Sequence, residues 1–289
     1  MVKILLDTHM YHATLSVAEE CYKAADLGYA YIELSPRADF HEWHHYPKVN
    51  DADIAKVKQA MAESGVKIWT FNPVFNWSSP DEWTRKMHVR NFRRLLQIAN
   101  DLEVPMIATE LSGDPNRPTE CEWAFFASIE ELAPDFEKYG ISCTVEAHPY
   151  DFIETNARCV DIVRGVNKDW FNYEFCCAHA FHLSEGAGNV REMLAYAGEK
   201  LAHVHVADVY NHRANIGNRY IMNPPGVDAR IHAHNEIGNG EVPWDEVFGY
   251  LRETNYDGPL AVSVFGWEED ADAIHVRMRE RIEAELAAN

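Results

Sequence analysis

The sequence alternates short β-rich runs with longer amphipathic helical runs, and this alternation repeats eight times. The expected strands are KILLD (3–7), YAYIEL (29–34), VKIWTF (66–71), PMIATEL (105–111), ISCTVEA (141–147), NYEFCCA (172–178), LAHVHVA (201–207) and GPLAVSV (258–264). The expected helices are near 16–27, 51–64, 82–102, 120–139, 155–165, 189–199, 244–254 and 269–286. Because a helix separates each strand from the next, the sheet is expected to be parallel.

Eight strand–helix units predict an α/β fold in which the sheet closes on itself, a (β/α)8 TIM barrel. A length of 289 residues suits one such domain, and no Pro/Gly/Ser-rich linker divides the chain, so we expect a single domain over 1–289. A doubly wound open sheet is the alternative. It is disfavoured because no GxGxxG follows the first strand and no GxxxxGK(S/T) motif occurs. Gly28, Gly65 and Gly140 stand where helices turn into strands, as expected of C-terminal caps.

The formal net charge of -20 disfavours binding to a nucleic-acid backbone. The six cysteines form no CxxC pair, and those in apolar strand-like runs are expected to act as small buried hydrophobes in a reducing compartment. The N-terminus MVKILLDTHMYH is typical of a first strand and not of a signal peptide. No run is long enough to span a membrane, so a cytoplasmic protein is expected.

Three residues that can bind a metal stand at the C-terminal ends of three successive strand-like segments. They are Glu146 in TVEAHP, His179 in FCCAHAFH and His205 in LAHVHVAD, separated by 33 and 26 residues. A strand, its return helix and the next strand need about 30 residues, so these side chains are expected to meet at one end of the barrel. One carboxylate with two imidazoles suits a divalent metal. We expect Mn, with Zn, Co, Fe or Mg as alternatives.

Other residues near the same strand ends are candidates for proton transfer and substrate binding. His148 follows the predicted carboxylate ligand by two positions and is the candidate general base, because an imidazole titrates near neutral pH. The alternative is that the His148-Pro149 step only fixes a turn. His182 is either a substrate-contacting group or a packing histidine. His203 is expected to be a satisfied core histidine, and Asp208 to orient a ligand imidazole. Potential hydroxyl-binding groups for a polyol are Asp7, His9, His12, Glu33 and Arg37, the alternative being that they stabilise loops.

A long irregular segment, 209–243, follows the seventh predicted strand. Such a connection inside a compact domain is usually a lid or a binding loop, the alternative being a decorative insertion. Within it, Asn223-Pro224-Pro225-Gly226 predicts a turn. His232 and His234 lie on one side of an extended strand, from where the pair could reach the metal from above.

Several motifs resemble the xylose-isomerase-like barrel superfamily, which holds sugar isomerases, keto-sugar epimerases, inosose dehydratases and apurinic endonucleases. The resemblance covers essentially the whole chain, and its most specific motifs are VEAHP, HAFH, HVHVAD and IHAHNEIGNGEVPW. The segments YIELSPRADF, HVHVADVYNHRA, RYIMNPPG and FGWEE are similar to an inositol-catabolism branch. The chain also resembles the catalytic subunits of bacterial C-glycoside deglycosidases, which implies a small partner subunit or a homo-oligomer.

Two positions depart from the pattern that this resemblance implies. His179 stands where the family has Asp, and Ser263 stands where it has Glu on the eighth strand. Family epimerases use carboxylates on the fifth and eighth strands as opposed acid and base, both of which also bind the metal. A serine hydroxyl cannot be that base, because its pKa lies far above neutral. In the apurinic endonucleases the positions matching His232 and His234 bind metal, which makes His234 the expected fourth ligand.

These residues together predict a divalent-metal-dependent enzyme that acts on an oxidised sugar, a sugar glycoside or a keto-cyclitol. It would remove the proton next to the carbonyl, with His148 as the base and Glu146 and His182 as further catalytic residues. Because the eighth-strand carboxylate is absent, elimination of the dehydratase or C-deglycosidase kind is favoured. The alternatives are a sugar isomerase or epimerase of inositol or pentose catabolism and a non-catalytic sugar-binding barrel.

Overall fold

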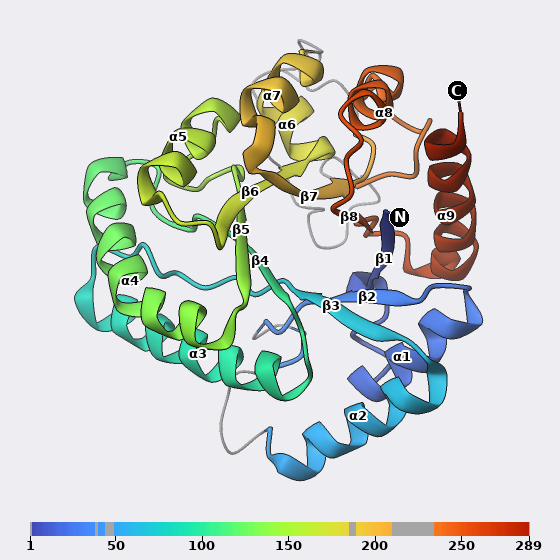
Figure 1. The fold of residues 1–289 in the computed structure, drawn as a ribbon, viewed down its shortest axis with the longest axis horizontal. Helices are drawn as coiled ribbons and strands as arrows, with labels where there is room; N and C mark the ends of the chain where they lie inside the picture. The colour runs from blue at the N-terminus through green and yellow to red at the C-terminus, as the bar shows by residue number, and fades with distance from the viewer. Residues whose placement is uncertain (1, 38–39, 44–48, 185–188, 210–233, 289) are drawn as a thin grey trace.

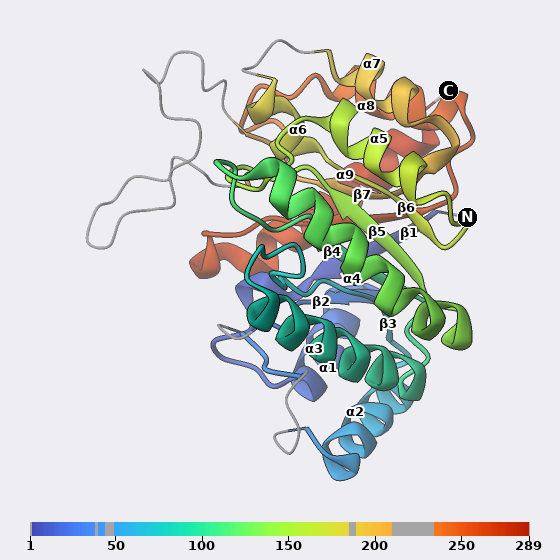
Figure 2. The same cartoon turned by 90° about the vertical axis from the view of Figure 1, so that its left-hand side faces the viewer.

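The computed structural model describes residues 2–37, 40–43, 49–184, 189–209 and 234–288, apart from the side chains of residues 182 and 183. Eight parallel strands close into a barrel in sequence order, with the helices outside it (Figures 1 and 2). The strands are β1 Lys3–Asp7, β2 Tyr31–Leu34, β3 Lys67–Phe71, β4 Met106–Glu110, β5 Ser142–Glu146, β6 Phe171–Cys176, β7 Leu201–Val206 and β8 Pro259–Val262. The predicted TIM barrel is thereby confirmed.

The helices follow the predicted spans, with one addition between β6 and β7. They are α1 Val17–Asp26, α2 Asp51–Ser64, α3 Glu82–Asp101, α4 Pro118–Tyr139, α5 Asn156–Val166, α6 Cys177–Leu183, α7 Val190–Ala197, α8 Trp244–Glu253 and α9 Ala271–Ala287. Short 3-10 turns are η1 Thr8–Met10, η2 Gly198–Lys200 and η4 Glu268–Asp270. Gly28, Gly65 and Gly140 have positive φ angles of 81°, 75° and 64°, as expected of the residues that end helices.

Helix α6 corrects one expectation about the metal-capable residues. The sixth strand was expected to continue to residue 178, but it ends at Cys176 and the chain turns at once into α6. His179 and His182 therefore stand on a helix and not at a strand end. The residues around them are mostly apolar. In a short apolar run, periodicity does not distinguish a strand from a buried helix, so the sequence does not show where the strand ends.

Alternate residues of β5, β6 and β7 point into the barrel, so that polar side chains form two layers inside it. Glu174 pairs in register with His203, and one step further along the same two strands Cys176 pairs with His205. Because parallel strands run in one direction, the second pair lies nearer the carboxyl end of the barrel, where Glu146 ends β5. This arrangement brings the predicted ligands to one end of the barrel.

The long connection after β7 is described only at its two ends. Residues 210–233 lie outside the described residues, and with them the predicted Asn223–Gly226 turn and His232. After this gap, Asn235 pairs with Asp208 in an antiparallel bridge, which fixes the neighbouring His234 beside the end of β7. None of the helices in the described ranges combines the length and the hydropathy that crossing a membrane requires.

Candidate metal and proton-transfer site

A cavity of about 430 Å³ opens at the carboxyl end of the barrel, where TIM barrels carry their sites. Its lining residues come from most of the strands and include His9, His12, Arg37, Phe40, Glu110, Glu146, His148, His179, His205, His234, Ser263 and Phe265. A larger cavity of about 810 Å³ opens at the opposite end. Its described lining holds no group of side chains spaced to bind a metal, so the smaller cavity is the candidate site.

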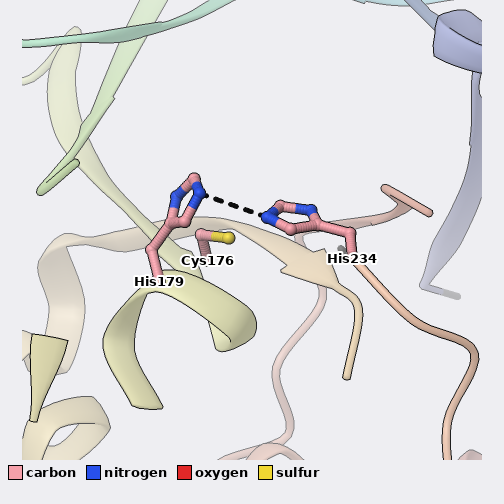
Figure 3. A group of neighbouring side chains, drawn as sticks. All are labelled: Cys176, His179 and His234. Carbon is pink, nitrogen blue, oxygen red and sulfur yellow. Dashed lines mark hydrogen bonds between the residues drawn. The ribbon is translucent and has the colours of Figure 1, made fainter. Parts of the chain in front are cut away.

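Three buried residues that line this cavity, Glu146, His179 and His234, together with the neighbouring Cys176, form what we call the mouth cluster. Nδ1 of His179 lies 2.8 Å from Oε2 of Glu146, and Nε2 of His179 lies 3.1 Å from Nε2 of His234. Figure 3 shows the two imidazoles facing each other with the Cys176 thiol beside them. His179 thus contacts two of the other predicted ligands, Glu146 and His234, directly.

The partners of His234 assign its tautomer. Nδ1 lies 2.7 Å from the carbonyl oxygen of Ser263, which can only accept, so the proton sits on Nδ1. Burial lowers the pKa of His234 to about 3, which keeps the ring neutral and leaves a lone pair on Nε2. A backbone carbonyl holding one ring nitrogen while the other faces a cluster of donors is the usual arrangement of a metal-binding histidine. The mouth cluster therefore fits a divalent cation.

Beneath it lies a second group, which we call the inner cluster: Glu33, Glu174, His203 and His205, all at most 2% exposed. His205 lies between the two carboxylates, with Nε2 2.8 Å from Glu33 and Nδ1 3.0 Å from Glu174. His203 is held by the same two acids at 3.4 and 3.2 Å. His203 is buried as expected, but neither of its ring nitrogens makes a hydrogen bond among the described residues, so the expectation of a satisfied core histidine is not borne out.

Charge in the inner cluster shifts its pKa values in complementary directions. Burial opposes protonation of His205, but the negative charges of Glu174 and Glu33 raise its pKa well above the usual range. Burial likewise opposes ionisation of Glu174, yet the imidazoles lower its pKa. To bind a metal, His205 must break its contact with one of the two carboxylates and lose the proton from that ring nitrogen. The other carboxylate would then orient the ring.

Glu146 lies in a different electrostatic environment. Burial raises the pKa of its carboxyl well above the usual range, and the negative charges of Glu174 and Glu110 add to this effect. A buried carboxylate with acidic neighbours needs a compensating positive charge. A bound divalent cation would supply that charge, which supports the choice of Glu146 as a ligand.

The predicted base, His148, lines the cavity next to the mouth cluster. Its ring packs edge-on against His179, with 4.5 Å between the ring centroids. Nδ1 lies 2.8 Å from the carbonyl oxygen of Pro149, so Nδ1 carries the proton, and Nε2 lies 3.7 Å from Oε1 of Glu110. Burial and the charge of Glu110 raise the pKa of the neighbouring Asp151 carboxyl. His148 thus packs against the predicted ligand His179 and has Glu110 as an acidic neighbour.

Ser263, the departure on the eighth strand, does face the cavity. Its hydroxyl donates to Oδ2 of Asp7 at 2.9 Å, and Ser263 is 3% exposed. The charge of His9 lowers the pKa of Asp7 despite the burial that opposes ionisation. The carboxylate of Asp7, the last residue of β1, therefore lies close to position 263, where the family pattern has Glu.

Two expectations about supporting residues are wrong. Asp208 does not orient an imidazole. Its carboxylate accepts hydrogen bonds from the backbone N–H groups of residues 209, 238 and 242 and from Nε1 of Trp244, so it fixes the segment after the gap. Glu33 does not contact the cavity as a hydroxyl-binding group, because it is fully buried in the inner cluster. His9, His12 and Arg37 do line the cavity, whereas the side chain of His182 lies outside the described residues.

Glu110, Glu174 and Cys176 belong to the site but were absent from the predicted set. Glu110 ends β4 as Glu146 ends β5, and the two are paired in register, so the strand-end rule that selected Glu146 applied equally to Glu110. Glu174 and Cys176 are two residues apart on β6, and the period of two would have turned both inward. The cysteine was interpreted as a packing group because its run is apolar.

A protein-family model described as the xylose isomerase-like TIM barrel matches residues 21–281. An inosose isomerase from Halalkalibacterium halodurans is 20% identical over 245 residues, which cover 82% of this chain and 79% of that protein. A D-psicose 3-epimerase from Agrobacterium fabrum is 23% identical over 256 residues, covering 84% of this chain and 77% of that protein.

Solved structures show the same fold at low identity. A D-psicose 3-epimerase determined in the presence of D-fructose superposes with a TM-score of 0.75 at 18% identity and 100% coverage of both chains. The IOLI protein with a bound zinc atom gives 0.76 at 18% identity, covering 99% of this chain and 98% of that one. A probable 3-DHS dehydratase from Bacillus anthracis gives 0.76 at 15% identity, covering 98% and 99%.

Proposed function

The chain belongs to the family of xylose isomerase-like TIM barrels, and from this premise we propose that it is a divalent-metal-dependent enzyme acting on a keto-sugar or keto-cyclitol. The proposed reaction moves the proton on the carbon next to the carbonyl, as a sugar isomerase does. The observation that carries the proposal is the convergence of Glu146, His179, His205 and His234 in one cavity beside His148. A volume of about 430 Å³ suits a small molecule.

Glu146, His179 and His234 would hold the metal, with His205 joining them once it releases one carboxylate. When bound, the metal would polarise the substrate carbonyl and make the neighbouring C–H proton acidic. Mn was the metal expected from sequence, and a zinc atom is bound in one structural relative. The donors themselves, two or three imidazoles and one carboxylate, suit several divalent metals.

His148 is the proposed base. Because Pro149 holds the proton on Nδ1, the other ring nitrogen has a lone pair with which to accept the substrate proton. The carboxylate of Glu110, 3.7 Å from that nitrogen, would then stabilise the imidazolium. Glu110 is therefore a positioning residue, comparable to the acid that supports the histidine in a catalytic triad.

A single base is sufficient for isomerisation. The proton that His148 removes from one carbon can return to the neighbouring carbon on the same face, through an enediol of the substrate. Two-base epimerisation needs a second group on the opposite face, and Ser263 does not provide one. The isomerase and epimerase named among the relatives support this class of reaction better than the elimination that the sequence favours.

Elimination remains a second candidate because of one specific observation, the serine at position 263. Ser263 cannot return a proton to the opposite face of the enediol. If the enediol instead expels a substituent from the neighbouring carbon, the reaction is completed with His148 as the only base. A probable dehydratase among the structural relatives has the same fold. The substrate would then be a keto-cyclitol, or an oxidised C-glycoside if the chain works with a partner subunit.

Proton exchange tests the proposal. The metal-loaded protein is incubated in D2O with a panel of keto-sugars, inososes and 3-keto-glycosides, and the products are followed by NMR and mass spectrometry. Isomerisation gives a product of unchanged composition that carries deuterium next to the carbonyl, whereas elimination gives a product that has lost water or an aglycone. We expect deuterium incorporation with at least one inosose or ketose.

The matched variants separate the base from the ligands. His148→Asn should keep the metal but lose roughly 100- to 10,000-fold in exchange rate, the usual contribution of a positioned base. His88→Asn changes a histidine of α3 that does not line the cavity, and it should exchange as the wild type does. Unchanged exchange in His148→Asn would assign the proton transfer to another residue, with His182 the first to test. Absence of exchange with the whole panel would favour a sugar-binding barrel.

A further inference from the structure

Cys176 is the last residue of β6 and lies at the centre of the candidate ligands. Its sulfur lies within 4.8 Å of ring nitrogens of both His179 and His234, and within the same distance of Glu146 and His205 in a second group. Together, the two groups contain all four ligands predicted from sequence. The thiol is thus shared between them, as Figure 3 shows for the two imidazoles.

The surroundings of this thiol differ from those of a packing cysteine. A buried cysteine normally lies among apolar side chains, where it acts as a small hydrophobe. Cys176 is 2% exposed, yet its sulfur lies close to three imidazoles and a carboxylate inside the barrel. The next residue, Cys177, is equally buried but begins α6 and belongs to no such group among the described residues.

The neighbouring nitrogen atoms are already oriented for a cation. Nε2 of His234 presents a lone pair, because Nδ1 donates to the carbonyl of Ser263. Nε2 of His179 lies 3.1 Å from it, while Nδ1 of His179 is held by Glu146. A cation bound between the two imidazoles would have the Cys176 sulfur as its nearest remaining soft donor.

We propose that Cys176 is a metal ligand, which joins His179 and His234 in a mixed nitrogen–sulfur set. This inference rests on the metal dependence of the proposed function. Carboxylate and water ligands suit Mn and Mg, whereas thiolate with imidazole selects Zn and chemically similar ions. The site therefore prefers Zn²⁺ or Co²⁺ to Mn²⁺, contrary to the metal expected from sequence.

Cobalt spectroscopy tests the assignment independently of turnover. The metal-free, full-length protein is titrated with Co²⁺, and a thiolate-to-cobalt charge-transfer band is followed in the near ultraviolet. We expect one equivalent of Co²⁺ to produce the band in the wild type and in Cys177→Ala, the matched control. Cys176→Ser should bind Co²⁺ without the band, and its affinity for Zn²⁺ should fall at least roughly 10- to 100-fold, since even outer groups have effects of this size.

A measurement on the wild type keeps the test valid if Cys176→Ser does not fold. X-ray absorption at the zinc edge should show one sulfur at about 2.3 Å together with nitrogen or oxygen at about 2.0 Å. Cobalt binding without the band, or a zinc shell without sulfur, overturns the role of Cys176 and leaves the proposed function intact. Absence of cobalt and zinc binding overturns the role of Cys176, and absence of manganese binding as well overturns the proposed function. Persistence of the band in Cys176→Ser also overturns the assignment.

Discussion

The inner cluster and the mouth cluster lie in successive layers of one barrel, and their charges are balanced in different ways. In the inner cluster each imidazole lies between two carboxylates, so every charge has a partner within the protein. In the mouth cluster two imidazoles face each other across 3.1 Å, and a single carboxylate serves them. In the first arrangement the carboxylates and imidazoles balance one another, whereas the second gains its missing charge from a cation.

This difference predicts different consequences of mutation. A buried ion pair that loses one partner leaves an uncompensated charge, so variants of the inner cluster should lose stability. Variants of the mouth cluster remove groups that are not yet charge-balanced, so they should lose metal and little stability.

Glu174→Gln should have the largest effect. It removes the carboxylate that contacts both His203 and His205, and breaking a buried pair in this way destabilises a protein by about 3–5 kcal/mol. Urea unfolding of the metal-free protein measures this change. Glu246→Gln, an exposed position on α8, is the control and should stay within about 0.5 kcal/mol of the wild type. A loss of less than 1 kcal/mol for Glu174→Gln would mean that the inner cluster does not hold the barrel together.

The double variant Glu146→Ala/His234→Ala tests the mouth cluster. Removing two donors should lower metal affinity by more than about 100-fold, the upper end of the effect of losing a supporting group. The metal-free variant breaks the 2.8 Å contact between Glu146 and His179 and should lose about 1–3 kcal/mol, less than Glu174→Gln, whose carboxylate contacts two imidazoles. Elemental analysis after dialysis gives the metal content. Full occupancy in the double variant would place the metal elsewhere.

Thr144→Val sharpens the comparison within the inner cluster. The Thr144 hydroxyl donates to Oε2 of Glu174 at 3.2 Å, and losing a hydrogen bond to a charged group costs about 1.5–3 kcal/mol. Thr70→Val is the matched control, because the buried hydroxyl of Thr70 has no hydrogen-bond partner among the described residues. The control should be neutral or slightly stabilising. Equal losses in both variants would attribute the effect to packing.

Ser263→Glu should have the smallest effect on stability. The new carboxylate would face the cavity beside Asp7, and repulsion between the two should destabilise the metal-free protein by about 1 kcal/mol. Metal binding should recover this loss if the carboxylate becomes a ligand. Ser263→Gln has the same size without the charge and separates repulsion from crowding. Thermal unfolding with and without Zn²⁺ measures both, and no recovery with metal would show that position 263 does not reach the ion.

Sequence periodicity predicted the barrel well because each unit combines a buried strand with an amphipathic helix and ends in a recognisable turn. It predicted Glu146 and His205 for the same reason, since both stand at or next to strand ends. It misplaced His179, because an apolar run hides the change from β6 to α6. His234 needed the family resemblance, since its position depends on the bridge between Asp208 and Asn235, a contact distant in sequence.

The contacts within the inner cluster could not be predicted from the sequence for a different physical reason. Whether a buried acid is structural or functional depends on its partners, and the partners of Glu33, a residue of β2, are His203 and His205 of β7. Only the closed barrel brings them together. The same holds for Cys176, whose apolar neighbours along the chain conceal the imidazoles that face it in space.

Anomalous diffraction from zinc-loaded crystals of the wild type tests the central claim most directly. The account predicts one zinc peak per chain within bonding distance of Nε2 of His179 and Nε2 of His234, and of the Cys176 sulfur, while Glu33 and Glu174 keep their contacts with His203. A zinc peak between Glu33 and His203, or one beside Glu110 and Asp151 with none in the mouth cluster, would contradict it.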